Sequence, residues 1–199
     1  MRVAVLVSGG GSNLQALIEA RAAGAMPHAR LVLVLSSKPD VLALKRAEQA
    51  GIPAKVVAKA QFAQEADFDA ALLEELRHHR IDVVVLAGFL PVLGLQVLAE
   101  YHDCILNVHP SLIPSFCGKG FYGLNVHEAA LERGVCISGA TVHLVNEVVD
   151  GGRILAQKAV PVQKGDTPES LQQRVMEQAE WILLPQALED YCAELSAKL

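Results

Sequence analysis

Aromatic residues are scarce in this chain: they make up 5% of its 199 residues, whereas 52% of the residues are hydrophobic. The apolar content is therefore mostly Ala, Val and Leu, a composition typical of parallel strands that are buried on both faces. A chain of this length suits one domain with a sizeable core.

The chain also lacks a basic cluster and a long apolar run. Its formal net charge is -5 and its Lys and Arg residues are dispersed, which argues against a nucleic-acid groove. The most apolar stretch, residues 83–98, is too short for a membrane span and is interrupted by Gly88, Pro91 and Gly94. The first apolar run leads straight into glycines and does not resemble a signal peptide. We therefore expect a cytoplasmic protein that binds neither nucleic acid nor membrane.

The sequence contains no motif for a metal, a disulfide or a covalent nucleophile. The four cysteines are Cys104, Cys117, Cys136 and Cys192. No two of them have a C-x-x-C spacing, so we expect free thiols in a reducing cytosol. His102, Cys104 and His109 lie at irregular offsets, which predicts no metal site. Ser111 has no G-x-S-x-G elbow around it.

Apolar runs and helical periodicity alternate along the chain. Strands are predicted over residues 2–7, 30–35, 54–57, 82–87, 103–108, 139–145 and 154–162. Helices are predicted over residues 12–23, 41–50, 67–79, 126–133 and 170–197, and another begins near residue 93. Ser12 and Gln15 form a predicted capping box, and Pro185 marks a break or a second start in the last helix.

This alternation predicts an α/β fold with a doubly wound, mostly parallel Rossmann-like sheet, helices on both faces and late antiparallel strands. The last two strands bracket Asp150-Gly151-Gly152, which predicts a tight connection. Ligands of such sheets bind beyond the carboxyl ends of the strands. The glycine turn after the first strand, the turn at Gly88 and residues 107–109 lie at such ends, so we expect them to line one crevice.

The glycine turn of residues 8–13 joins the first strand to the first helix. Glycines let a phosphate approach the backbone, and a helix N-terminus offers N–H groups to an anion. Leu14 stands where the dinucleotide fingerprint needs a third glycine, and the Walker lysine is missing. The turn thus favours a single phosphomonoester, with Ser12 and Asn13 as side-chain donors; the alternative is a plain tight turn.

Asn107 and His109 lie two residues apart in an extended segment, so their side chains point to the same side. An amide and an imidazole together can hold the oxyanion that forms when a carbonyl is attacked. A carboxylate from Asp150 would favour the protonated form of the His. The alternatives are a capping Asn, a satisfied loop His and an Asp that only makes a turn. His143, on the preceding strand, either supports this group or packs in the core.

Three segments together resemble the folate-dependent formyltransferases. They are N-x-H-P-S-L-I-P at residues 107–114, Asp-Gly-Gly at 150–152 and Ser-Gly-Gly-Gly-Ser-Asn at 8–13. The resemblance runs from Val3 to about Leu188, and the Gly-Ser-Asn turn is more specific for the members that act on glycinamide ribonucleotide. It implies one formyltransferase domain over residues 1–199, with a nucleotide-phosphate half at about 1–100 and a catalytic and folate half at about 80–199. It also implies transfer of the formyl group of 10-formyltetrahydrofolate, the co-substrate, to the amine of glycinamide ribonucleotide in purine biosynthesis, without a metal.

The resemblance implies a role for each matching residue. Asn107 would bind the formyl oxygen and the folate, His109 would be the catalytic imidazole, and Asp150 would keep it charged. Glu180 would contact the ribose, although its spacing is one residue longer than in many members. The 5′-phosphate would be held by Gly11, Ser12 and Asn13, and the pterin by backbone groups of Leu90, Pro91, Val92 and Leu93.

Two departures from the family pattern concern the folate. Phe89-Leu90-Pro91 replaces the common Phe-Met-Arg, so Pro91 lacks an N–H, and a family arginine is replaced near Gln64-Glu65. The loop of residues 117–123 is longer than in some members and is a candidate lid.

Other functions remain open. A formyltetrahydrofolate hydrolase would carry an added N-terminal domain, for which a first strand at Arg2 leaves no room. A methionyl-tRNA formyltransferase would carry a C-terminal nucleic-acid-binding domain. A phosphate or nucleotide sensor on the same fold would need no oxyanion donors. The protein is expected to act as a monomer or a homodimer.

Overall fold

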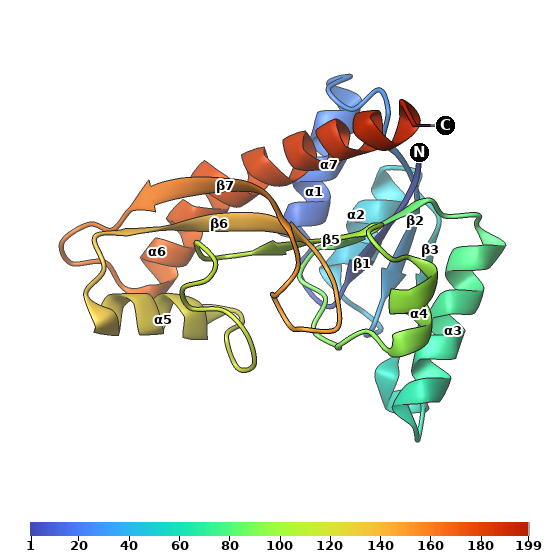
Figure 1. Ribbon diagram of the computed structural model, residues 1–199, viewed down its shortest axis with the longest axis horizontal. Helices are drawn as coiled ribbons and strands as arrows, with labels where there is room; N and C mark the ends of the chain where they lie inside the picture. The colour runs from blue at the N-terminus through green and yellow to red at the C-terminus, as the bar shows by residue number, and fades with distance from the viewer. Residues whose placement is uncertain (199) are drawn as a thin grey trace.

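The computed structural model describes residues 1–198. A seven-stranded sheet runs in the order β3-β2-β1-β4-β5-β6-β7 through the molecule (Figure 1). The strands are β1 (Arg2–Val7), β2 (Arg30–Ser36), β3 (Ala54–Val56), β4 (Val83–Leu86), β5 (Ile105–His109), β6 (Ile137–Leu144) and β7 (Ile154–Pro161). The first five strands pair in parallel, whereas β6 and β7 are antiparallel to their neighbours. The predicted fold class is confirmed.

Helices cover both faces of this sheet (Figure 1). They are α1 (Ser12–Ala22), α2 (Leu42–Gln49), α3 (Glu65–His78), α4 (Leu95–Glu100), α5 (Leu124–Arg133), α6 (Pro168–Val175) and α7 (Trp181–Ser196), with a 3-10 turn η1 (Lys59–Gln61) and a π-helical turn η2 (Met176–Glu180). None of the helices in residues 1–198 has the length and apolar character needed to cross a membrane.

The alternation of side chains along β1 builds a core on each face. Val3, Val5 and Val7 join the core that is shared with α1, α2, α5, α6 and α7. Ala4 and Leu6 join the second core, which is formed with α3 and α4. Burial on both faces explains why the parallel strands read as continuous apolar runs.

The strand order reverses at β1, which lies between β2 and β4. The chain leaves β1 through α1 toward β2 on one side and leaves β4 through α4 toward β5 on the other, so the loops after β1 and β4 diverge and open a crevice. The glycine turn follows β1, the 88–94 turn follows β4, and residues 107–109 end β5. All three predicted segments therefore lie at the same edge of the sheet.

Two predictions about helix ends were wrong. Ser12 and Gln15 make no capping box: Gly11 is the N-cap, in a left-handed conformation with φ 71°, and the Gln15 side chain bonds Glu19 and Arg46 instead. Pro185 does not break the last helix, because α7 runs through it. The carbonyl that a residue at position 185 would bond belongs to Trp181, next to the π-helical turn, where the backbone is already widened.

Candidate active site

A cavity of about 770 Å³ lies at the carboxyl ends of β1, β4 and β5. Its volume is typical of a site for small organic ligands. Ten residues expected at the site line it: Ser12, Asn13, Leu90, Pro91, Val92, Leu93, Asn107, His109, Asp150 and Glu180. Gly11 does not line it, since its Cα packs against α2, where a Cβ would lie 2.7 Å from the Cβ of Ala43.

The strand β5 presents Asn107 and His109 on the same side. Its antiparallel partner β6 places His143 opposite Asn107, and their side chains meet with 3.0 Å between Nδ2 and Nε2. The turn after β6 brings back Asp150, whose Oδ2 lies 3.5 Å from Nδ1 of His109. Its Oδ1 lies 3.5 Å from Nε2 of His143. The expected amide, imidazole and carboxylate therefore converge, together with His143.

Glycine at position 152 is required for this convergence. A Cβ on Gly152 would lie 1.8 Å from the carbonyl oxygen of Leu144, so any side chain there would push the turn away from β6. Asp150 itself has a positive φ of 56°, which Asp tolerates better than most residues. The Asp-Gly-Gly sequence thus makes a turn and also delivers a carboxylate, so its two readings are compatible.

The hydrogen bonds fix the orientation of the Asn107 amide. Nδ1 of His143 lies 2.8 Å from the carbonyl oxygen of Leu144, which can only accept, so Nδ1 carries the proton. Nε2 is then the acceptor for the amide N–H of Asn107. The second N–H of that amide remains available for a ligand. Of the two roles foreseen for His143, support of the site is the one that this geometry favours.

The loop of residues 115–123 closes on the same group. Nε2 of His109 donates to the carbonyl of Phe116 at 2.9 Å, and the N–H of Gly118 donates to Oδ2 of Asp150 at 2.8 Å. Both ring nitrogens of His109 thus face acceptors. In this conformation the loop is bonded to Nε2 of His109 and Oδ2 of Asp150, which are groups that the reaction would need.

Burial lowers the pKa of His109 below its ordinary value of 6.5. The hydrogen bond to the Phe116 carbonyl and the charge of Asp150 act in the opposite direction without cancelling the effect of burial. Burial likewise favours a raised pKa at Asp150, but the hydrogen bond from the N–H of Gly118 and the charge on His109 help to hold it below its ordinary value. Asp150 therefore acts in the expected direction, but desolvation outweighs it, so the net shift of the His109 pKa is downward and not upward.

The glycine turn presents its backbone to the cavity edge. Within residues 1–198, no group accepts a hydrogen bond from the N–H of Gly10 or Gly11. On the far side, α2 holds the turn: the carbonyl of Gly9 accepts from Ala43 and that of Gly10 accepts from Arg46. A strand-to-helix turn with open N–H groups is suited to an anion.

Similarity to known proteins extends over almost the whole chain. The model of the formyl transferase family matches residues 1–188. A phosphoribosylglycinamide formyltransferase structure from Brucella melitensis is 43% identical, covers 96% of this chain and 95% of that one, and superposes with a TM-score of 0.87. The glycinamide ribonucleotide transformylase 1 of Symbiobacterium toebii is 39% identical over 98% of this chain and 88% of that one, with a TM-score of 0.91.

The chain belongs to the formyl transferase family, in its phosphoribosylglycinamide formyltransferase branch. The resemblance seen in the motifs is thereby confirmed. The human trifunctional purine biosynthetic protein adenosine-3 is 45% identical, across 94% of this chain and 18% of that protein. The chloroplastic phosphoribosylglycinamide formyltransferase of Vigna unguiculata is 38% identical, across 97% of this chain and 61% of that protein. The chain thus spans less than two thirds of the length of these relatives.

Glu180 ends the π-helical turn η2, where the helix is locally widened. From this turn Glu180 reaches the glycine turn, where its Oε2 accepts from Nδ2 of Asn13 at 2.6 Å. Burial raises the pKa of Glu180 while this bond lowers it, and Oδ1 of Asn13 is buried with no partner in residues 1–198. Oδ1 of Asn13 is therefore an acceptor without a donor, and a hydroxyl or amine of a ligand can supply that donor.

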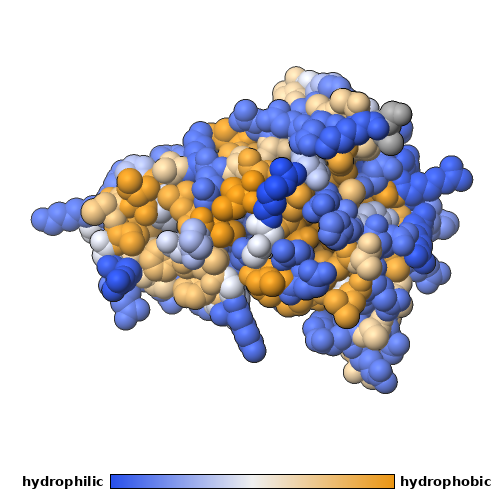
Figure 2. Space-filling view, viewed as in Figure 1, coloured by the Kyte–Doolittle hydropathy of each residue, from blue (hydrophilic) through white to orange (hydrophobic). Residues whose placement is uncertain are grey.

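The 88–94 turn departs from the formyl transferase pattern at Pro91, but it still offers donors. The N–H of Leu90 is taken by Oγ of Ser8 at 2.9 Å. No described residue accepts from the N–H of Val92 or Leu93. Asp69 on α3 anchors the turn by accepting from Gly94 at 2.8 Å and from Gln96 at 2.9 Å. Hydrophobic side chains gather on this face between the 115–123 loop and α4 (Figure 2), where Leu90, Val92 and Leu95 are exposed.

The comparisons with known proteins do not test the prediction that the site holds no metal. Within residues 1–198, no group of three or more His, Cys, Asp or Glu side chains is placed to hold a metal ion. All four cysteines are free thiols.

His127 is a further residue of the site that no sequence motif marks. It lies on α5 in the cavity wall, fully buried, and neither ring nitrogen has a hydrogen-bond partner in residues 1–198. Burial, assisted by the charge of His109, lowers its pKa to about 4. The signal that could have found it is its spacing in the predicted helix of residues 126–133. There His127 lies beside Val126 and three residues before Ala130, on the face that is buried.

His127→Leu should remove part of the acid sensitivity of the fold. The folded chain protonates His127 only near pH 4, whereas an unfolded chain does so at its ordinary value of 6.5. Stability is therefore lost as pH falls from 6.5 toward 4, by at most about 3 kcal/mol. Urea unfolding at pH 7, 5.5 and 4.5 should show a shallower loss for the variant. Equal losses in the two proteins would contradict this role of His127.

Proposed function

We propose that this chain transfers the formyl group of 10-formyltetrahydrofolate to the amine of glycinamide ribonucleotide. The observation that supports this most strongly is the convergence of Asn107, His109 and Asp150 in one buried cluster of the cavity. The acceptor is the one in the names of the phosphoribosylglycinamide formyltransferases, and the donor is the one that the motif resemblance implies. The same assignment places the protein in purine biosynthesis.

The cavity offers a place for each substrate. The 5′-phosphate binds the backbone N–H groups of the glycine turn at Gly11, Ser12 and Asn13, with the ribose against Glu180. The pterin lies along residues 90–93, where Val92 and Leu93 supply N–H groups and the Pro91 carbonyl remains an acceptor. Residues 1–100 thus supply most of the phosphate site, and residues 80–199 supply catalysis and the folate site.

The reaction proceeds by direct acyl transfer. The amine attacks the formyl carbon, and the formyl oxygen becomes negative as the tetrahedral intermediate forms. The Asn107 amide and the His109 ring donate hydrogen bonds to this oxygen, which replaces the Phe116 carbonyl as the acceptor of the His109 N–H. The intermediate then collapses, the bond to the folate nitrogen breaks, and a proton moves from the attacking amine to that nitrogen through water. Holding both substrates together contributes much of the rate.

Asp150 makes the charged form of His109 accessible. Burial alone would leave the ring neutral, and the carboxylate opposes that effect. As negative charge grows on the formyl oxygen, a second anion faces the ring and favours its protonation. His109 is therefore charged in the reacting complex although burial lowers its pKa.

The test is a turnover assay with purified protein, glycinamide ribonucleotide and 10-formyltetrahydrofolate. Release of tetrahydrofolate only when both substrates are present supports the proposal. Release without the ribonucleotide would favour a hydrolase, and binding without release would favour a sensor. We expect no nucleic-acid or membrane partner, a monomer or a homodimer, and a cytoplasmic location, although the plant relatives are named as chloroplastic.

Asn13→Ala should weaken the binding of the ribonucleotide more than the binding of the folate. The change removes the amide that holds Glu180 and leaves that buried carboxyl without its donor. The loss of such a bond to a charged group corresponds to about tenfold in affinity. KM for glycinamide ribonucleotide should rise by that factor while KM for 10-formyltetrahydrofolate stays within about twofold. An equal rise for both would count against the phosphate and ribose assignment.

A further inference from the structure

The cavity is poor in positive charge for a site that takes two anions. Three acidic residues line it: Glu147, Asp150 and Glu180. Among its described lining residues, Lys119 is the one Lys or Arg. The helix N-terminus at the glycine turn contributes only about half a charge. A phosphate group and the carboxylates of a folate tail would both meet a predominantly negative wall, so a cation at the rim has a large effect on binding.

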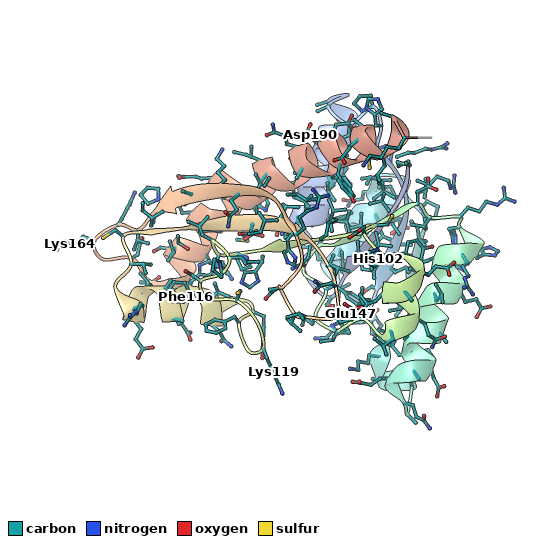
Figure 3. The ribbon with its side chains drawn as sticks, viewed as in Figure 1. His102, Phe116, Lys119, Glu147, Lys164 and Asp190 are labelled. Carbon is teal, nitrogen blue, oxygen red and sulfur yellow. The ribbon has the colours of Figure 1, made fainter. Side chains whose placement is uncertain are left out.

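Lys119 is not engaged elsewhere. Its side chain is exposed, and no ion pair or hydrogen bond joins its ammonium group to any other residue of 1–198. It extends from the tip of the 115–123 loop, away from the body of the molecule (Figure 3). An uncommitted ammonium on the rim of a cavity is available to a ligand without breaking a bond within the protein.

The tip of the loop that carries Lys119 has a glycine on each side of the lysine and open space around it. Gly118 and Gly120 flank the lysine with φ of 89° and 94°, a region that glycine enters without strain. A Cβ at either position would meet nothing within 4 Å, so the loop tip is not packed against the body. The loop's hydrogen bonds to His109 and Asp150 involve groups that the reaction needs. Substrate entry therefore competes with the contacts that hold the loop where it is.

We propose that Lys119 is a substrate-binding residue whose ammonium group pairs with an anionic group of a bound substrate. This inference rests on the proposed function, because it takes the two anionic substrates from it. The group is either the phosphate of the ribonucleotide or a carboxylate of the folate tail. Both are oxyanions that an ammonium recognises as a point charge.

The test uses three variants of the full chain. Lys119→Met removes the charge and keeps the length of the side chain, whereas Lys119→Arg keeps the charge. Lys164→Met removes the same charge from an exposed lysine in the connection between β7 and α6, at the far end of the molecule (Figure 3). Calorimetry measures the binding of glycinamide ribonucleotide and of 10-formyltetrahydrofolate separately, so that binding is read without turnover.

Lys119→Met should weaken one of the two ligands by about tenfold, while Lys119→Arg stays within about threefold of the wild type and Lys164→Met is unchanged. The difference between wild type and Lys119→Met should shrink in about 0.5 M salt, since the ions screen an exposed pair. If Lys119 pairs with the phosphate, wild type and Lys119→Met should bind glycinamide riboside, which has no phosphate, equally well. If Lys119 pairs with a carboxylate, the two proteins should bind a formylated tetrahydropteroate that lacks the glutamate equally well.

Wild-type affinity for both ligands in Lys119→Met, within about twofold, would overturn the assignment and leave the proposed function intact. An equal loss in Lys164→Met would also overturn it, since net charge would then be the cause. A wild-type protein that binds neither ligand would overturn the proposed function as well, and that result appears before any variant is compared.

Discussion

Asp150→Asn should reduce kcat by about 10³-fold while changing either KM by less than about threefold. The substitution keeps the shape of the side chain and one acceptor for the N–H of Gly118, which donates to Asp150 at 2.8 Å. It removes the negative charge that lies 3.5 Å from Nδ1 of His109. Without that charge, the effect of burial on the ring is opposed less, so the pKa of His109 falls further and the protonated form becomes too scarce to stabilise the oxyanion.

The matched control for this variant is Asp190→Asn. Asp190 is an exposed residue on α7 and lies outside the cavity described above (Figure 3). Initial rates at saturating substrate, measured from pH 6 to pH 9 for both variants, separate a loss of charge support from a general loss of structure. An Asp150→Asn protein with near-normal kcat would refute the role of the carboxylate.

Asn107→Ala should lower kcat by about 10²- to 10³-fold, the cost of removing one donor from an oxyanion site. Its amide has one N–H committed to His143 at 3.0 Å, so the other is directed by that bond. The substitution removes stabilisation mainly from the transition state, because the formyl oxygen accepts a hydrogen bond more strongly when it is negative than when it is a carbonyl oxygen. KM for the ribonucleotide should change little.

Asn107→Asp distinguishes this role from a packing role. It preserves the volume of the side chain but replaces the donor by an anion that repels the oxyanion. Single-turnover rates should therefore fall at least as far as in Asn107→Ala. Recovery of the rate in Asn107→Asp, or a rise in KM with kcat unchanged, would contradict the assignment.

The fold was predictable because each element carries a strong local signal. The strands at residues 2–7, 30–35 and 82–87 are nearly continuous apolar runs, and β1, β2 and β4 match them within two residues at either end. The capping box that was wrongly predicted at Ser12 and Gln15 depends on tertiary contacts. Gly11 caps α1 because the turn must clear Ala43 on α2, a neighbour that local sequence does not identify.

The candidate site was partly predictable for the same reason. Asn107 and His109 share a side through strand geometry alone, whereas the approach of Asp150 depends on the pairing of β5 with β6. The sign of the His109 pKa shift could not be foreseen. It is set by how deeply the ring is buried relative to the carboxylate beside it, and depth is a property of the assembled fold. His127 and the loop contact at Phe116 were missed because both arise from the packing of segments that share no motif.

The most direct test of the account is the pKa of His109, measured by NMR titration of its ring in the wild type and in Asp150→Asn. The account predicts that the wild-type pKa lies below the ordinary value for histidine and that the variant's pKa lies lower still. It also predicts that the wild-type value rises when both a formyl-folate analogue and the ribonucleotide are bound. A pKa that is unchanged or higher in Asp150→Asn would show that the carboxylate does not support the charged ring, and the proposed chemistry would have to be abandoned.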